Sequence, residues 1–339
     1  MKQSIALGKI HGFVDDLEAT ANQDVDLNYQ GIESILMAGM GGSAISSTIV
    51  ANLCSSTVDI PISVIKTTRI PNWVNEKTLC IISSYSGNTE ETLEMYKRAM
   101  DRGAKMVVIT SGGKLMELAR SNNIPLFLIP KGFEPRYTAG FMIGHLASIL
   151  KSLGYCELSR DIMDCIGRLR NYRNSLEAPG SLPRTIADGF SGYVFVLCTH
   201  RKYKSIALRW KAQFNENSKM IAFDTDLSQL SSLKGRSWTN YKGNTLKLLV
   251  IAGEEDFSDG GLIPNVLDSF DNTGLSFQVI ALYGETYVER ILRAIILGDY
   301  ITVLIAEQKR IDPEVTTVIS ELKRRIRSKD PFSAEEEKE

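Results

Sequence analysis

The sequence predicts a three-layer α/β/α protein made of two doubly wound subdomains, each built on a parallel sheet. Short runs that are apolar throughout alternate with longer segments of helical spacing, which is typical of parallel strands covered by helices on both faces. This alternation stops near residue 178 and then starts again. The length of 339 residues also corresponds to about two domains.

The first half contains five predicted strands, all short apolar runs, at residues 34–38, 62–65, 79–83, 106–110 and 126–129. Helices are predicted between them at 43–53, 89–102 and 114–121. In the second of these helices, Leu93, Tyr96 and Met100 recur at the spacing of one helical face. Together these elements form the first doubly wound unit.

Two predicted helices, at 138–153 and 158–177, lead to a break at 178–183, where two prolines and a glycine interrupt the pattern. The second unit follows, with strands at 193–198, 246–251 and 277–282 and helices at 202–215, 287–307 and 313–327. The expected domains are therefore an N-terminal unit at 1–153, a helical linker at 154–183, a C-terminal unit at 184–328 and a disordered acidic tail at 329–339.

Composition excludes several classes of protein. The 39 Lys and Arg residues balance 40 Asp and Glu residues, so no basic surface for nucleic acid is expected. The longest uninterrupted apolar run covers only residues 193–198, too short to cross a membrane. Five scattered cysteines without C-x-x-C spacing and three isolated histidines predict no metal site. The N-terminus turns acidic before any long apolar stretch, so we expect a cytoplasmic protein without a secretory signal.

A glycine-rich loop, Gly39-Met-Gly-Gly-Ser-Ala44, lies between the first strand and the first helix. It matches the dinucleotide fingerprint G-x-G-x-x-A, with Asp59 about twenty residues further on. The same pattern also fits a tight strand-to-helix turn whose glycines adopt positive φ. No P-loop lysine follows Gly42, which argues against a nucleoside triphosphate.

A second loop, residues 83–92, places the hydroxyls of Ser84, Ser86, Thr89 and Thr92 around a helix start. Asn88 with Glu91 resembles a capping box, so capping explains part of the pattern. One helix end needs fewer groups than this, and hydroxyls with free N–H groups at a helix N-terminus can hold a dianion without lysine. Both loops would meet at the carboxyl edge of one sheet, which favours a phosphate monoester over a dinucleotide.

These loops carry a resemblance to a known family. GMGGSAIS, SYSGNTEETL, ITSGGKL and EPR occur in that order, and RWKAQFNENSK follows at 209–219. The closing segments contain Gly298-Asp-Tyr, Asp312-Pro and Glu321-Leu-Lys323. The chain resembles SIS (sugar isomerase) domain proteins and, more narrowly, the bifunctional phosphoglucose/phosphomannose isomerases. The resemblance implies interconversion of glucose 6-phosphate or mannose 6-phosphate with fructose 6-phosphate through a cis-enediolate. It also implies no cofactor, no metal and a homodimer whose two subunits shape each site.

The resemblance also implies roles for particular residues. Glu216 would move the proton between C1 and C2, Arg136 would stabilise the enediolate, and Lys323 would lie near the ring oxygen. Without the motif, each of the three would be read as an ordinary charged surface residue. The phosphate would bind to the two loops, at Gly41, Gly42, Ser43, Ser84, Ser86 and Thr89.

One motif departs from the family. The usual Glu-Leu-Asn-His-Asn-Glu, whose histidine assists ring opening, is replaced by Gln229-Leu-Ser-Ser-Leu-Lys234, so Ser232 takes the place of that histidine. A general acid–base group contributes roughly 10²–10⁴ in rate, which a serine does not supply. Three readings follow: an isomerase that opens the ring with Lys323, His200 or water or takes open substrate, an enzyme of altered specificity, or a non-catalytic phosphosugar-binding protein. An NAD-dependent dehydrogenase is a less favoured fourth.

Overall fold

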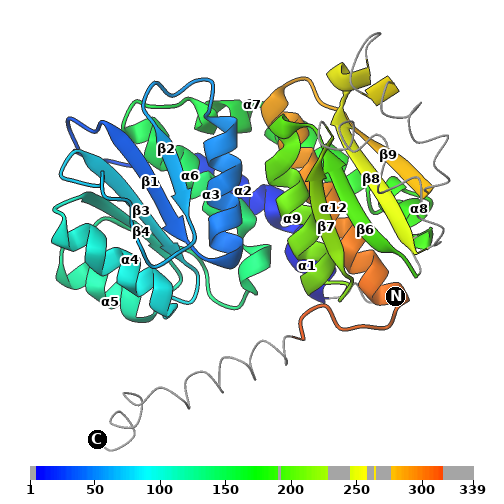
Figure 1. Cartoon of the computed structure of the whole chain (residues 1–339), viewed down its shortest axis with the longest axis horizontal. Coiled ribbons are helices and arrows are strands. Elements are labelled where there is room, and N and C mark those ends of the chain that lie inside the picture. The colour runs from blue at the N-terminus through cyan, green and yellow to red at the C-terminus, as the bar shows by residue number, and fades with distance from the viewer. Residues whose placement is uncertain (1–4, 190–191, 228–244, 258–262, 265–275, 316–339) are drawn as a thin grey trace, which may run out of the picture.

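The computed structural model describes residues 5–189, 192–227, 245–257, 263–264 and 276–315. Within them the chain forms two parallel sheets, one in each half, with helices between and around them (Figure 1). The predicted fold class is confirmed. Lys323 and Ser232 lie outside the described residues.

The first sheet has the strand order β2-β1-β3-β4-β5, with all neighbours parallel. Its strands are β1 (Ser34–Gly39), β2 (Ile62–Ile65), β3 (Thr78–Ser84), β4 (Lys105–Thr110) and β5 (Leu126–Leu128). The chain moves from β1 to one side and then returns to the other side for β3. The carboxyl ends of β1 and β3 are therefore the switch point at which open α/β sheets bind ligands.

Two layers of helices cover this sheet. The helices α4 (Glu90–Asp101) and α5 (Gly113–Ser121) pack on one face, against Leu36 and Ala38 of β1. The other face, with Ile35 and Met37, packs against α3 (Gly41–Leu53), α6 (Ala139–Ser152) and α2 (Phe13–Ala21). Consecutive residues of β1 thus enter opposite cores, which explains why the strand is apolar at every position.

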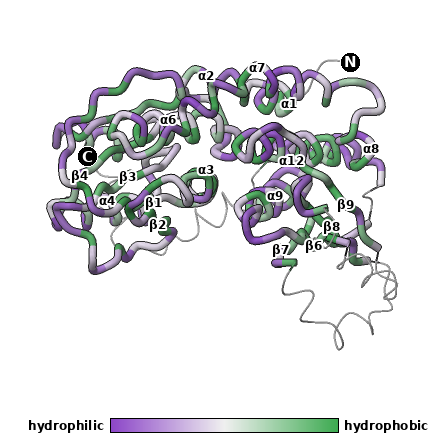
Figure 2. Tube along the Cα trace, turned by 90° about the horizontal axis from the view of Figure 1, so that it is seen from above, coloured by the Kyte–Doolittle hydropathy of each residue, from purple (hydrophilic) through white to green (hydrophobic). Residues whose placement is uncertain are grey.

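The second sheet has the order β7-β6-β8-β9, again parallel. Its strands are β6 (Val194–Thr199), β7 (Ala222–Asp226), β8 (Leu246–Gly253) and β9 (Ser276–Leu282). The described helices around this sheet include α8 (Leu182–Asp188), α9 (Lys204–Glu216) and α12 (Tyr287–Gln308), and α7 (Leu158–Ser175) packs against both α12 and α2. Seen from above, α12 lies between α9 and the pair α1 (Ile5–His11) and α7 (Figure 2).

The two halves share contacts around α3 and α9. Asn52 of α3 accepts hydrogen bonds from Ser205 of α9 (3.1 Å) and from the hydroxyl of Tyr287 (2.9 Å). One apolar cluster also runs through both halves, from β1 to the buried α12. The residues Ile291, Ile295, Ile296 and Ile301 of α12 belong to this core, so they are not available for a contact between subunits.

Most predicted elements are found within one or two residues of their expected ends. Among the α-helices and strands that the structure describes, four were not predicted: α1, α2, α8 and β7. Helix α8 begins at Leu182, where a break was expected, because Pro183 stands in its first turn, where a missing N–H costs nothing. Residues 313–315 of the predicted helix 313–327 are not helical: Pro313 and Glu314 lie in a turn, in which Asp312 accepts from Glu314 N. The rest of that helix lies outside the described residues, and the predicted domain boundaries stay predictions.

None of the helices that the structure describes is both long and apolar enough to span a membrane.

Candidate active site

A pocket of about 410 Å³ lies at the carboxyl ends of β1 and β3. The structure brings together there eight of the residues predicted from sequence: Gly41, Gly42, Ser43, Ser84, Ser86, Thr89, Arg136 and Glu216. It adds five lining residues that the sequence analysis did not select: Met40, Tyr85, Glu91, Glu134 and Pro135. The remaining predicted residue, Lys323, is not among the described residues.

In the first loop a single residue, Met40, connects the end of β1 to the start of α3. Met40 is the N-cap of α3 in extended conformation and makes no side-chain capping bond. Gly41 has a φ of +52°, which a residue with a Cβ rarely adopts. A Cβ on Gly42 would lie 3.1 Å from the carbonyl oxygen of Pro135. Gly42 therefore lets the segment that carries Arg136 approach the start of α3.

The second loop places hydroxyls at the start of α4. The hydroxyl of Ser84 donates to Thr89 Oγ1 (3.2 Å), and Ser86 Oγ lies 3.5 Å from the same atom. The capping box proposed for Asn88 is wrong: its side chain accepts from Lys114 N at the start of α5 (2.9 Å) and does not cap α4. Thr92 is fully buried and is not among the lining residues of the pocket.

Two helix N-termini therefore open into one pocket without side-chain caps, at Met40 for α3 and at Thr89 for α4. Uncapped N–H groups at a helix start carry partial positive charge and bind anions. Among the described lining residues, Arg136 is the one cation, so the loop itself supplies its donors through backbone and hydroxyl groups. This chemistry suits a phosphate group.

Arg136 is held rigidly on the short 3₁₀ turn η1 (Pro135–Tyr137). Its guanidinium is buried, and its Nε donates to Asn217 Oδ1 (2.8 Å) while its Nη2 donates to the carbonyl of Pro313 (2.6 Å). Its Nη1 lies 3.4 Å from Glu216 Oε2 and 3.8 Å from Glu134 Oε2. One edge of the guanidinium is thus anchored in protein, and Nη1 faces two carboxylates of the pocket.

Glu216 is the last residue of α9, and 37% of its side chain is exposed. It comes from the second half of the molecule, whereas the two loops come from the first. The pocket is therefore built where α3 and η1 meet the end of α9. A partly exposed carboxylate in a pocket can serve as a proton acceptor.

Behind Glu216, a buried polar network fixes the end of α9. Arg209 and Asp299 form an ion pair of 2.6 Å, and Arg209 also donates to the carbonyl of Arg136 (3.2 Å). Burial raises the pKa of Asp299, and Arg209 opposes this rise. Asn217 accepts from Arg136 and from the hydroxyl of Tyr137 (3.1 Å) and donates to Thr302 Oγ1 (3.0 Å). Sequence reasoning missed Asn217, although it stands inside the NENSK motif.

The segment at 313–315 runs beside the same guanidinium. The carbonyl of Pro313 accepts from Arg136, and the carbonyl of Val315 accepts from Lys219 Nζ (2.8 Å). Lys219 has a φ of +53°, and burial followed by the nearby Arg136 lowers its pKa. Pro313 therefore contacts Arg136, a residue that lines the pocket.

None of the three histidines lines the pocket. His200 follows β6, where its Nδ1 lies 4.0 Å from Asp256 Oδ1, and His145 is buried in α6. His11 contacts Glu177 at 2.7 Å, between α1 and the end of α7. His200 was considered as a ring-opening group, and it is not among the residues that line the pocket with Glu216 and Arg136.

Asp59, the acidic residue of the possible dinucleotide fingerprint, is not placed where it could bind a ribose. Asp59 precedes β2 and so lies toward the amino edge of the parallel sheet, whereas the glycine loop lies at the carboxyl edge. An acid that binds a ribose stands at the carboxyl end of the second strand. That end is followed here by Lys66-Thr-Thr-Arg69.

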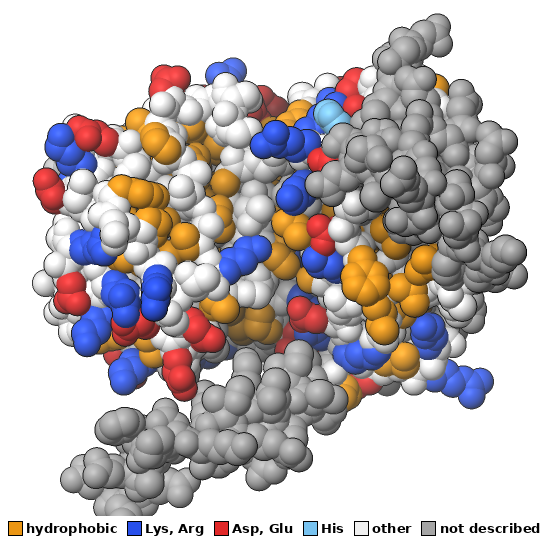
Figure 3. Space-filling model, in the orientation of Figure 1, with side chains coloured by type: hydrophobic (Ala, Val, Ile, Leu, Met, Phe, Trp, Pro, Cys, Tyr) orange, Lys and Arg blue, Asp and Glu red, His pale blue; other side chains and the backbone are white. Residues whose placement is uncertain are grey.

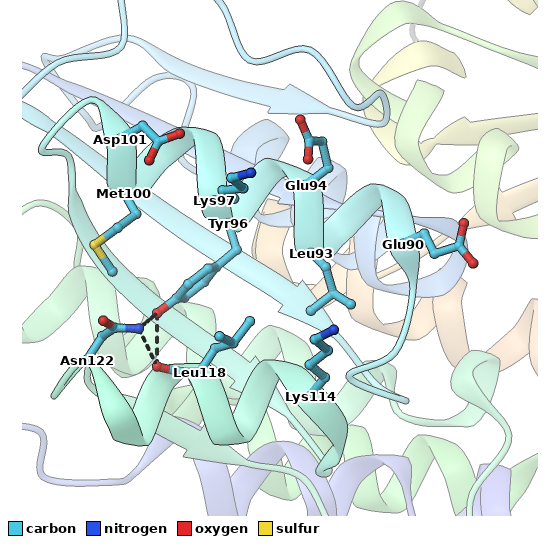
Figure 4. Close-up of a pocket in the computed structure, with 10 residues that line it drawn as sticks. All are labelled: Glu90, Leu93, Glu94, Tyr96, Lys97, Met100, Asp101, Lys114, Leu118 and Asn122. Carbon is cyan, nitrogen blue, oxygen red and sulfur yellow. Dashed lines mark hydrogen bonds between the residues drawn. The ribbon is translucent and has the colours of Figure 1, made fainter. Parts of the chain in front are cut away.

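A second hollow, of about 470 Å³, lies between α4 and α5 on the outside of the first half. Figure 4 shows Leu93, Tyr96 and Leu118 between the two helices. The hydroxyl of Tyr96 donates to Leu118 O (3.1 Å) and accepts from Asn122 (3.1 Å). The Tyr96 hydroxyl thus joins the two helices, and none of the predicted site residues lines this hollow.

Comparisons with known proteins agree with this geometry. Residues 181–326 match the model of the bacterial phospho-glucose isomerase C-terminal SIS domain. The chain is 31% identical to a bifunctional phosphoglucose/phosphomannose isomerase of Aquifex aeolicus, over 94% of this chain and 97% of that protein. It is 27% identical to a D-glucosamine-6-phosphate 4-epimerase of Sulfolobus acidocaldarius, over 86% of this chain and 89% of that protein.

Among solved structures, the C-terminal domain of glucosamine-fructose-6-phosphate aminotransferase from Francisella tularensis superposes with a TM-score of 0.72 at 14% identity. The alignment covers 91% of this chain and 97% of that one, which shows a shared fold. With two SIS-type sheets and 31% identity along almost its whole length to a named member, the chain belongs to the bifunctional phosphoglucose/phosphomannose isomerase family.

Proposed function

We propose that the protein is an aldose–ketose isomerase that interconverts glucose 6-phosphate or mannose 6-phosphate with fructose 6-phosphate. One observation carries the proposal: two uncapped helix N-termini, Glu216 and Arg136 share one pocket. A protein that only bound a phosphosugar would need the first two features without the second pair. Membership of the isomerase family supports the same reaction.

In this proposal the phosphate group binds to the starts of α3 and α4, with hydrogen bonds from Ser43, Ser84, Ser86 and Thr89. The other end of the substrate then extends toward Glu216 and Arg136, which line the same pocket. Holding the phosphate fixes the distance between the sugar carbons and the base, which lowers the entropic part of the barrier.

Glu216 removes the proton from C2 of the aldose and returns it to C1, and the reverse transfer serves the ketose. Negative charge develops on the enediolate oxygens, and the buried guanidinium of Arg136 stabilises it without reorganisation. Asn217 and Pro313 keep the guanidinium in place. These steps use residues of the chain alone.

Ring opening has no histidine in this pocket. We propose that Lys323, water or the use of open-chain substrate takes its place. Because the open-chain form is a minor species, this reading predicts slower turnover of cyclic substrate than of the open form. Introducing the family's residue, as Ser232→His, should then raise the rate on cyclic substrate, and no increase would contradict this account.

A second candidate is different chemistry on the same class of substrate. Similarity to a D-glucosamine-6-phosphate 4-epimerase favours it, because that protein by its name acts on a 6-phosphorylated sugar at a different carbon. The phosphate loops would serve both reactions equally. Incubation with glucosamine 6-phosphate, followed by separation of the 4-epimers, distinguishes the two functions.

We also propose that the protein is a homodimer in the cytoplasm. The edge strand β7 supports a subunit contact, because Phe223 on it and Ile221 before it are 56% and 62% exposed. Figure 3 shows hydrophobic side chains gathered over this strand. Light scattering after size exclusion should give a dimer, and Phe223→Glu should yield monomer if this edge is the contact.

The isomerase proposal is tested with Glu216→Gln. This variant keeps the shape of the side chain and removes the base, so kcat should fall by roughly 10²–10⁴. Binding of fructose 6-phosphate, measured by calorimetry, should remain. The matched control is Glu33→Gln, an exposed glutamate before β1 that pairs with Lys77. Equal activity of Glu216→Gln and wild type, or binding of NAD(H) without binding of sugar phosphates, would contradict the proposal.

A further inference from the structure

Two cysteines from distant parts of the chain meet outside the pocket. Cys54 is the C-cap of α3, and Cys156 lies in the connection between α6 and α7. Their Sγ atoms are 3.2 Å apart, although the residues are separated by 102 positions. The other cysteines have different environments: Cys165 and Cys198 donate to carbonyls of their own elements, and Cys80 is buried in β3.

The two thiols are not equivalent. Cys156 receives a hydrogen bond from Cys54 that, together with Thr57 and the N–H of Leu158, outweighs desolvation and lowers its pKa to about 6. The hydrogen bond with Cys156 and burial raise the pKa of Cys54. Of the two thiols, Cys156 is therefore the one that ionises more readily. A thiolate is the nucleophilic form of cysteine.

The sulfur of Cys156 is also the more accessible of the two. Cys156 lines a pocket of about 250 Å³, together with Thr57, Gly154, Tyr155, Glu157 and Asp161. Cys54 is completely buried behind it. Two of the lining side chains are acidic, so they disfavour an anionic oxidant such as glutathione disulfide. The pocket instead suits a small neutral oxidant.

From this arrangement we propose that Cys54 and Cys156 form a redox-active dithiol site that reacts with hydrogen peroxide and closes to an intramolecular disulfide. The Cys156 thiolate attacks one peroxide oxygen: an S–O bond forms, the O–O bond breaks, and the leaving hydroxide takes up a proton as water. The sulfur of Cys54 then attacks Cys156: the S–S bond forms, the S–O bond breaks, and the released hydroxide takes the Cys54 proton as a second water. Two thiols lose two electrons and two protons, and the peroxide is reduced to two waters.

The disulfide joins the end of α3 to the α6–α7 connection and closes a long loop. Closing such a loop restricts the unfolded chain, so the oxidised protein should melt higher by about 5 °C. The pocket at Gly41 and Gly42 lies at the opposite end of α3. The site is therefore independent of the proposed isomerase activity, and its test needs no substrate.

The first experiment uses the wild-type protein. After treatment with peroxide and alkylation of the remaining thiols, intact-mass spectrometry should show loss of about 2 Da and three alkylated cysteines, reversed by dithiothreitol. Peptide mapping should find Cys54 joined to Cys156. Cys165→Ser is the matched control and should behave as wild type. Five alkylated cysteines after treatment, or a disulfide that involves another pair, would overturn the proposal.

The second experiment tests the order of attack. In Cys54→Ser the serine hydroxyl still donates to Cys156, but no second thiol follows, so dimedone should trap a sulfenic acid at Cys156. In Cys156→Ser dimedone should leave Cys54 unlabelled. Label on Cys54 would overturn the assignment. If either variant folds poorly, the alkylation rate of wild-type Cys156 replaces it: this rate should exceed that of Cys198 at least about tenfold at pH 7.

Discussion

The two sheets of this protein share one topology but differ at their carboxyl edges. In both, the first strand of the half lies between the second and third strands, as in β2-β1-β3 and β7-β6-β8. In the first half the loops after β1 and β3 carry glycines and hydroxyls, and they open into the pocket. In the second half the corresponding loops after β6 and β8 carry charged side chains.

These charged side chains neutralise one another. Lys202 after β6 lies 2.7 Å from Glu255 Oε1 and 3.1 Å from Asp256 Oδ1, both after β8. Asp256 also accepts from Gly253 N (3.0 Å), and Glu255 accepts from the hydroxyl of Tyr203 (2.9 Å). Carboxylates of the chain thus take the donors that a bound phosphate would use. The same topology gives a binding site only where the donors at the switch point are left free.

The largest expected effect comes from removing one cation from each edge, Arg136 in the first half and Lys202 in the second. Arg136→Gln removes the charge that we propose stabilises the enediolate, so kcat should fall by roughly 10²–10³. Lys202→Gln, at the matching edge of the second half, should keep wild-type activity. Steady-state assay of glucose 6-phosphate and mannose 6-phosphate checks both variants. A larger loss of activity in Lys202→Gln would contradict the assignment of the site to the first half.

The next comparison uses a glycine from each edge. A Cβ at Gly42 would lie 3.1 Å from the carbonyl of Pro135, so Gly42→Ala should push η1 from α3 and weaken phosphate-ester binding about tenfold. At Gly253, a Cβ would lie 2.1 Å from the Tyr203 hydroxyl and clash with Glu255. Gly253→Ala should therefore lower thermal stability with little change in affinity. Calorimetric titration and melting curves separate the two outcomes, and the reverse pattern would reject the comparison.

Asn217→Ala tests whether the second half positions Arg136, the arginine for which we propose a catalytic role. Loss of Oδ1 leaves Arg136 Nε without its partner, so kcat should fall about tenfold while KM for fructose 6-phosphate changes little. Asn217→Asp keeps an acceptor for Arg136 and should recover part of kcat. Equal losses of kcat in both variants would mean that Asn217 acts through packing alone.

The smallest expected effect is on the pH dependence of the free energy of unfolding, through Glu255 at the carboxyl edge of the second sheet. Burial alone would raise the pKa of Glu255, but hydrogen bonds from Lys202 and Tyr203 hold it at about 2. A carboxyl whose pKa is lowered on folding stabilises the protein above its unfolded value of 4.5 and loses this contribution as the pH falls toward 2. Glu255→Gln should therefore be less stable than wild type at pH 7, and the gap should close below pH 4.5. Urea midpoints along a pH series measure it, and a constant gap would exclude Glu255 as its source.

Sequence reasoning predicted the strands of the first half almost to the residue, because runs such as ILMA and LCII are apolar at every position and have no other stable environment. It missed β7, whose AFDTD pattern is short, polar and half exposed at a sheet edge. It misread Asn88, since a capping box is a local pattern and the actual partner, Lys114, lies 26 residues away. Local signals predict local contacts, and long-range competition for a hydrogen bond is not visible in them.

The site divides in the same way. The two loops were predictable from sequence, because glycine spacing and hydroxyls at a helix start carry their chemistry in the residue types. The sequence also indicated Glu216 and Arg136 by resemblance. The folded structure was needed to show that both helix ends are uncapped, that the end of α9 meets η1, and that Asn217 and Pro313 hold the guanidinium. It also showed that charged side chains after β6 and β8 pair with one another at the carboxyl edge of the second sheet. The physical reason is that a site depends on which donors and acceptors stay unpaired, and this is settled only when all of their competitors have been placed in space.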